Sequence, residues 1–306
     1  MKRFFSRLPK SKNPVTKLKI YQCLRVFMRW FWYIFQRVFL LVFISTWFVF
    51  IMWWFSQEPS LYRDWEEQDA VLADINWISD DEVRIENIRD HTWISDTEFI
   101  AWYLTETYSL SELERVYYSI TPFSDRDGPA HTMLSFTFQD GRHIVISAEI
   151  RKERWENFSI LWGILNQFEL QYVIATEEDV IQLRTHHRNN EVYMYPVILD
   201  NERLQLLFRS MLIRADKLSR EPEWYHTFWN NCTTTILQHA NAFRQEKIRA
   251  GIFAFLPAHS DRLVYELGLI DTRLSQTDAR EYYRIDVRAR ENMDLPFSEV
   301  IRPEVR

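Results

Sequence analysis

Residues 38–55 form a run of 18 residues without a charged side chain, and this run constrains the fold more than any other feature of the chain. At about 1.5 Å per residue, a helix of that length just spans a hydrocarbon core of roughly 30 Å. Trp53 and Trp54 close the run, as aromatic residues do at a membrane interface. We therefore expect a transmembrane helix over residues 38–57.

Charge is distributed unevenly about this run. Ten of the 37 Lys and Arg residues precede it and the first acidic residue is Glu58, so the remainder carries a net charge of −16. Because segments rich in Lys and Arg stay in the cytosol, this predicts a cytosolic N-terminus over residues 1–37 and an exported domain over 58–306. The basic segment is too long for a cleaved signal peptide and no small-x-small site follows, so we expect an uncleaved anchor.

Residues 20–36 are aromatic and carry Arg25 and Arg29 at helical spacing. Two interpretations remain open: a helix lying on the membrane surface, or a cytosolic continuation of the span. The cations fit contact with anionic lipid, whereas the acidity of the exported part argues against a nucleic-acid partner.

The exported part is long enough for one large domain with its own core. Apolar periodicity and turn signals predict strands at 82–88, 97–104, 114–120, 169–175 and 191–198, a hairpin at 131–150, and helices at 200–219, 232–246 and 260–269. Residues 58–80 are expected to form an irregular tether, and residues 124–129 a loop. Strands followed by late helices indicate an α+β fold with an antiparallel sheet.

The hairpin has a predictable register. Its apolar residues are all even-numbered: Leu134, Phe136 and Phe138 on one strand, and Ile144, Ile146, Ala148 and Ile150 on the other. Both sets share a face only if paired residue numbers have an even sum, because a slip of one residue exchanges the faces. A three-residue loop with Gly141 in the left-handed region satisfies this condition and pairs Leu134 with Ile146.

The same register places His131 opposite Glu149, with Cβ atoms about 5 Å apart. A carboxylate beside an imidazole raises the pKa of the imidazole and fixes its tautomer, which is the support that a catalytic base needs. The alternative is a solvated sheet face on which His131, Ser135, Ser147 and Glu149 have no chemical role.

Cys232 is the only cysteine beyond the apolar run, so it has no disulfide partner on its side of the membrane. Asn230 or Asn231 is expected to cap a helix that begins at Cys232, where the helix dipole and free N–H groups favour a thiolate. Those N–H groups, Asn231, Thr233 and Tyr225 are candidates to stabilise an oxyanion. His226 is a rival base, and a buried core cysteine is the alternative for the thiol.

These motifs together resemble the DUF4105 family, also called the Lnb N-terminal periplasmic domain. The resemblance is carried by Asn231-Cys232-Thr233, Ala130-His131-Thr132 and Ser147-Ala148-Glu149-Ile150-Arg151, with shorter pieces at 86–89, 172–177 and 224–225. It covers roughly residues 58–275. The order of histidine on a strand before cysteine at a helix start also resembles the permuted papain-like folds of the NlpC and LRAT types.

The resemblance implies a thiol acyl enzyme anchored in the bacterial inner membrane, with its main domain in the periplasm. In it, Cys232 is the nucleophile, His131 the base and Glu149 the group that orients the base. The implied substrate is a membrane lipid or lipoprotein acyl group. A cell-wall amidase or peptidase and a non-catalytic envelope binding domain remain the alternatives.

No cofactor is expected. His186 and His187 follow three acidic residues at 177–179, but no metal-binding motif is present and the segment 184–188 reads as basic and exposed. The five glycines form no nucleotide-binding or serine-hydrolase motif.

Overall fold

The structure, a computed structural model, describes residues 14–123, 128–249, 251–254 and 256–305. The chain divides into two compact units, Met1–Glu58 and Pro59–Arg306. Residues 124–127 of the expected loop lie outside the described residues.

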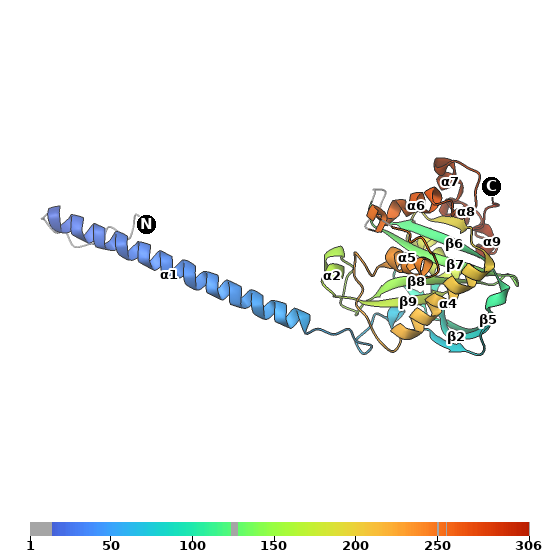
Figure 1. The fold of residues 1–306 in the computed structure, drawn as a ribbon, viewed down its shortest axis with the longest axis horizontal. Coiled ribbons are helices and arrows are strands. Elements are labelled where there is room, and N and C mark those ends of the chain that lie inside the picture. Colours follow the sequence, from blue (N-terminus) through green and yellow to red (C-terminus); the bar gives the residue numbers. More distant parts are fainter. Residues whose placement is uncertain (1–13, 124–127, 250, 255, 306) are drawn as a thin grey trace. The chain divides into compact units, whose positions relative to one another are not determined.

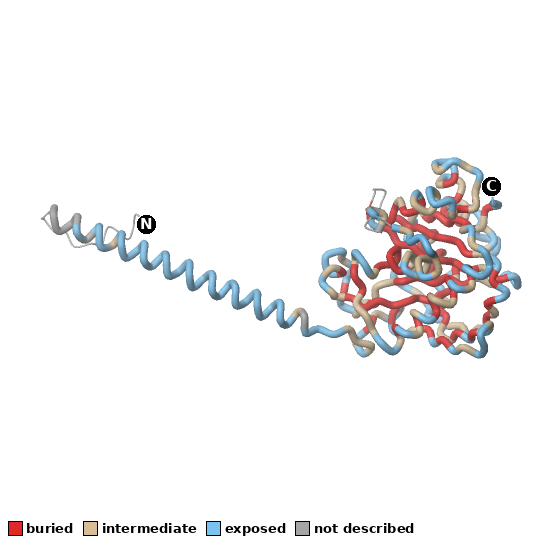
Figure 2. Tube along the Cα trace, in the orientation of Figure 1, coloured by how far each residue is buried: buried red, intermediate tan, exposed pale blue. Residues whose placement is uncertain are grey.

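The first unit contains one long helix, α1 (Pro14–Phe55). Residues 21–54 of α1 are apolar enough to cross a membrane, and Figure 2 shows this helix exposed along its length. The hydroxyl of Thr46 donates to Val42 O at 2.9 Å, which satisfies a polar group inside the helix without another partner. Residues 20–36 continue the same helix, which decides between the two interpretations of that segment.

The second unit is built on an eight-stranded sheet (Figure 1). Its strands are β1 (Asp74–Trp77), β2 (Glu82–Arg89), β5 (Tyr103–Ser109), β6 (Leu113–Pro122), β7 (Ala130–Phe138), β8 (His143–Arg151), β9 (Glu169–Ala175) and β10 (Tyr193–Val197). The order is β1-β2-β9-β8-β7-β6-β10, with β5 paired to β2. All pairs are antiparallel except β2 with β9, so the unit is of mixed α+β class.

Helices cover both faces of this sheet. They are α2 (Ile160–Ile164), α3 (Glu177–Gln182), α4 (Asn201–Leu218), α5 (Cys232–Ala242), α6 (Ser260–Glu266), α7 (Gln276–Tyr282), α8 (Asp286–Glu291) and α9 (Phe297–Val300), with short helical turns η2 (Glu67–Asp69), η3 (Leu110–Glu112), η4 (Leu183–His187), η5 (Gly251–Ala254) and η6 (Pro257–His259). A small second sheet pairs β3 (Thr92–Trp93) with β4 (Phe99–Ile100).

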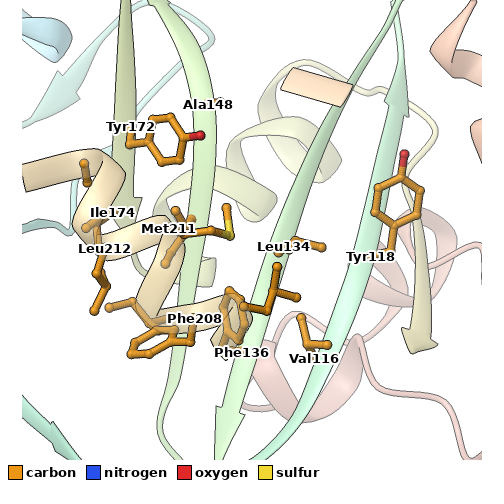
Figure 3. Close-up of a cluster of buried hydrophobic side chains, with 14 of the residues drawn as sticks. Val116, Tyr118, Leu134, Phe136, Ala148, Tyr172, Ile174, Phe208, Met211 and Leu212 are labelled. Atoms are coloured by element: carbon orange, nitrogen blue, oxygen red, sulfur yellow. The ribbon is translucent and has the colours of Figure 1, made fainter. Parts of the chain in front are cut away.

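The larger core lies between the sheet and α4 (Figure 3). The fully buried ring of Phe208 on α4 packs against Phe136, with ring centroids 4.9 Å apart, and against Phe138 at 5.7 Å. Asp200 caps α4 as expected, because its carboxylate accepts from Arg203 N at 2.8 Å. Helix α5 packs on the same face, which brings the start of α5 to the central hairpin.

The predicted hairpin register is confirmed. Leu134 pairs with Ile146 and Phe136 with Ile144, and Gly141 has φ +84° in the turn. All four even-numbered apolar residues are buried in the larger core.

The odd-numbered face of the hairpin is also buried, which corrects the solvated alternative. Met133 and Val145 pack into a second core with Val180 of α3 and Ile285, which immediately precedes α8. The helices on this face come from far along the chain, so the alternation inside the hairpin does not reveal them.

Several predicted boundaries were wrong. Residues 58–80 contain η2 and β1, because β1 pairs with β2 and closes the sheet edge. Residues 97–104 form no single strand but belong to β4 and β5. Helix α5 ends at Ala242, where the side chain of Asn241 bonds Ile248 N and O and turns the chain. Helices α2 and α3 interrupt the strands, and α6 is followed by three more helices.

Candidate active site

Cys232 is the first residue of α5 and is buried. The side-chain oxygen of Asn231 accepts from Thr234 N at 2.8 Å, and the Thr234 hydroxyl accepts from Asn231 N at 2.9 Å, so a capping box fixes the helix start. The Asn231 side chain also donates to Thr227 O at 2.6 Å. The N–H groups of Cys232 and Thr233 have no acceptor within the helix, as at any helix start, and point toward the thiol end.

His131 lies on β7 and is buried beside a chain of polar groups. Its Nε2 is 2.6 Å from Ser147 Oγ and 3.1 Å from Glu149 Oε1, and Ser147 Oγ donates to the same carboxylate at 2.9 Å. Arg184 pairs with Glu149 from the far side at 3.4 Å. Because Nε2 is engaged in this way, Nδ1 is the ring nitrogen left for the thiol.

The charges at the site favour a thiolate–imidazolium pair. Burial raises the pKa of Cys232, but the hydrogen bond to His131 and its positive charge lower it further, leaving the pKa at about 7 against the ordinary 9.0. Burial and Arg184 lower the pKa of His131, yet Glu149 and the thiol together raise it above its ordinary value. Burial opposes ionisation of Glu149, but His131, Arg184 and Arg89 hold the pKa of that carboxyl well below its usual range.

Cys232, His131 and Glu149 line one cavity of about 350 Å³. One part of its wall is apolar and is contributed by Phe123, Phe158, Ile160, Tyr225, Phe228 and Pro257. Another part is cationic, with Arg89, Lys152, Arg184 and Arg188. The thiol therefore opens onto a space that can take an acyl chain on one side and an anionic or polar group on the other.

The family model of the Lnb N-terminal periplasmic domain matches residues 98–265, more than half of the 306 residues. The chain belongs to this family. No protein of curated function and no solved structure is detectably similar to it, so the expected papain-like relationship stays a prediction. A periplasmic-domain family and an N-terminal apolar helix together fit a single-pass membrane protein.

In this Lnb domain the predicted supporting residues surround the thiol. Tyr225 lines the cavity; burial and the charge of Cys232 raise its pKa, so the phenol stays protonated and can donate. The Thr233 hydroxyl contacts Thr132 Oγ1 at 3.1 Å, which fixes α5 to β7. His226 accepts from Phe228 N at 3.1 Å and stacks on Trp229, so its Nδ1 is occupied away from the thiol.

Sequence reasoning missed two contributors to the Lnb site. Ser147 was placed only on the polar face, although its spacing of two from Glu149 puts both on the same side of β8. Arg184 was expected to be exposed, but the segment 183–187 forms a π-helix and buries it against Glu149.

The acidic residues that precede His186 are held in ion pairs. Glu177 is fully buried against Arg302 at 2.6 Å, and Asp179 against Arg89 at 2.8 Å. Both carboxylates therefore join the sheet to neighbouring segments and are not grouped with the histidines.

Proposed function

We propose that this Lnb domain is a cysteine-dependent acyltransferase or hydrolase that acts on acyl groups of membrane lipids or lipoproteins. The observation that carries the proposal is the buried Cys232 with a lowered pKa, hydrogen-bonded to a histidine that a buried carboxylate orients. Such an arrangement activates a thiol for attack on a carbonyl carbon. The order of histidine on a strand and cysteine at a helix start supports, as part of the proposal, a papain-like relationship.

The reaction has two halves. The Cys232 thiolate forms a bond to the acyl carbonyl carbon, the bond to the glyceryl oxygen breaks, and His131 gives its proton to the departing alkoxide. In the second half an amine or water attacks the thioester, His131 takes the proton, and the carbon–sulfur bond breaks to restore the thiolate. Glu149 keeps the imidazole oriented through both transfers.

Each half passes through a tetrahedral oxyanion. The backbone N–H groups at the start of α5 and the Tyr225 hydroxyl are the donors that line the cavity beside the sulfur. Asn231 and Thr233 act by fixing the helix start through their hydrogen bonds.

The apolar cavity wall and the membrane helix favour a lipid acyl donor over a soluble peptide. The cationic wall favours the rival amidase, because it suits the carboxylates of a cell-wall peptide. The two are separated by which acyl group becomes attached to Cys232.

The test incubates the full chain with phospholipid that carries an alkyne-tagged acyl chain and measures protein mass. We expect a hydroxylamine-labile acyl adduct on the wild type and on Cys23→Ala, the matched control, because only these two cysteines exist. The adduct should vanish in Cys232→Ala. An adduct that survives in Cys232→Ala removes the nucleophile from the proposal.

A further inference from the structure

Six large apolar side chains are solvent-exposed on one part of the second unit. This apolar rim consists of Trp155, Phe158, Leu161, Trp162, Phe228 and Trp229. Leu161 is 70% exposed, Trp155 66% and Trp229 63%. Single exposed apolar residues are ordinary, but a contiguous group of aromatic residues marks an interaction surface.

The rim residues come from two chain segments that are held together. Thr227 N donates to Gly163 O at 3.2 Å, and the Thr227 hydroxyl donates to Ile160 O at 3.0 Å. A Cβ at Gly163 would lie 2.5 Å from Thr227 Oγ1, so only glycine permits this approach of α2 to the segment before Cys232.

The rim borders the mouth of the active-site cavity. Phe158 and Phe228 line the cavity as well as belonging to the rim, and Ile160 lines it next to Leu161. Phe123 closes this wall and contacts Phe158 with ring centroids 5.9 Å apart. A molecule that covers the rim therefore covers the route to Cys232.

The chain enters the second unit beside the rim. Ser60 N donates to Glu169 Oε1 at 2.9 Å, and Arg63 pairs with Glu153 at 3.2 Å and lies over the Trp224 ring at 5.4 Å. Glu153 precedes Trp155 by two residues, and Trp224 begins the segment that leads to Trp229. Helix α1 ends at Phe55, so only residues 56–59 separate the helix from this entry point. Four extended residues reach at most about 14 Å.

We infer that the apolar rim docks on the bilayer surface from which the anchor helix emerges. Trp and Phe side chains concentrate at membrane interfaces, where an apolar ring and a polar edge are both accommodated. The short connection keeps the rim within reach of the lipid at all times. What passes through the cavity mouth rests on the proposed function, since a docked rim would let an acyl chain reach Cys232 without crossing water; the docking itself does not.

The experiment reconstitutes the full chain into phosphatidylethanolamine and phosphatidylglycerol vesicles that contain a phospholipid with a diazirine in its acyl chain. After irradiation, labelled peptides are identified by mass spectrometry. Residues 38–55 serve as the internal positive control. We expect labelling at 155–162 and 228–229 and none at Met293 and Leu295, which are 71% and 57% exposed beyond α8 and away from α2 in Figure 1. Labelling confined to α1, or equal at Met293 and Leu295, overturns the inference.

A matched pair of variants links docking to access. Leu161→Asp with Trp229→Asp should reduce rim labelling and slow acylation by vesicle phospholipid about tenfold or more, because binding strength follows the buried apolar area. Met293→Asp with Leu295→Asp should change neither. Alkylation of Cys232 by soluble iodoacetamide should be the same in both pairs, which shows that the rim variants keep the site folded. Equal acylation in the two pairs overturns the inference.

The failure of docking and the failure of the proposed function have different signatures. Rim labelling without any acyl adduct on Cys232 supports docking and contradicts the lipid acyltransferase. An adduct without rim labelling contradicts docking and leaves the thiol chemistry in place.

Discussion

At the scale of single residues, the two cysteines of the chain differ in surroundings rather than in kind. Cys23 is exposed on α1, whereas Cys232 is buried next to His131. Burial alone would make Cys232 an inert core thiol. The neighbouring imidazole reverses that effect, so the reactivity of the thiol depends on His131.

The pH dependence of Cys232 alkylation tests this dependence. In a Cys23→Ala background, the rate with iodoacetamide should rise with pH through a midpoint at about 7, because only the thiolate reacts. In His131→Asn, burial remains while the imidazolium is lost, so the midpoint should move up toward or beyond the ordinary 9.0. Superimposable curves would contradict the pairing of the two side chains.

Glu149 sets the other end of the active pH range. Its charge raises the pKa of His131, while the Arg184 charge lowers it. In Glu149→Gln only the lowering charge remains, so the high-pH limb of the acylation profile should shift to lower pH, each unit costing about tenfold on that limb. Ser147→Ala is the control, because it removes one hydrogen bond and leaves both charges. A larger shift in Ser147→Ala than in Glu149→Gln would assign the orienting role to the hydroxyl.

At the scale of elements, the start of α5 combines stability and chemistry, whereas the start of α4 is a cap alone. Asn231→Ala and Asp200→Ala each remove a capping acceptor and should each lower the free energy of unfolding by about 1 kcal/mol, measured by urea unfolding of the full chain in detergent. Only Asn231→Ala should also slow alkylation of Cys232, because it frees the helix that carries the thiol. An equal slowing in Asp200→Ala would make that effect one of general stability.

The sequence predicts elements well where a local pattern decides them. The hairpin register follows from the parity of its apolar residues and from one glycine, and both helix caps follow from a polar residue before an amphipathic run. The burial of the odd-numbered hairpin face could not be predicted in this way, because the side chains that cover it lie around residues 180 and 285. For the same reason the sequence indicated the His131–Glu149 pair but not Arg184, whose burial depends on the π-helix at 183–187.

At the scale of the whole molecule, charge and hydropathy give an orientation that neither unit specifies alone. Ten cations precede the apolar run and all 43 acidic residues follow it, which predicts a cytosolic N-terminus and a periplasmic second unit. Single cysteines in a Cys23→Ala, Cys232→Ala background report the side directly: Lys19→Cys before the span and Tyr62→Cys, 91% exposed, after it. In cells with a permeabilised outer membrane, a membrane-impermeant maleimide should label only the position-62 variant, and both variants should be labelled after lysis. Labelling of the position-19 variant in unlysed cells would reverse the orientation, and a thiol enzyme facing the cytosol would have no access to periplasmic lipoproteins.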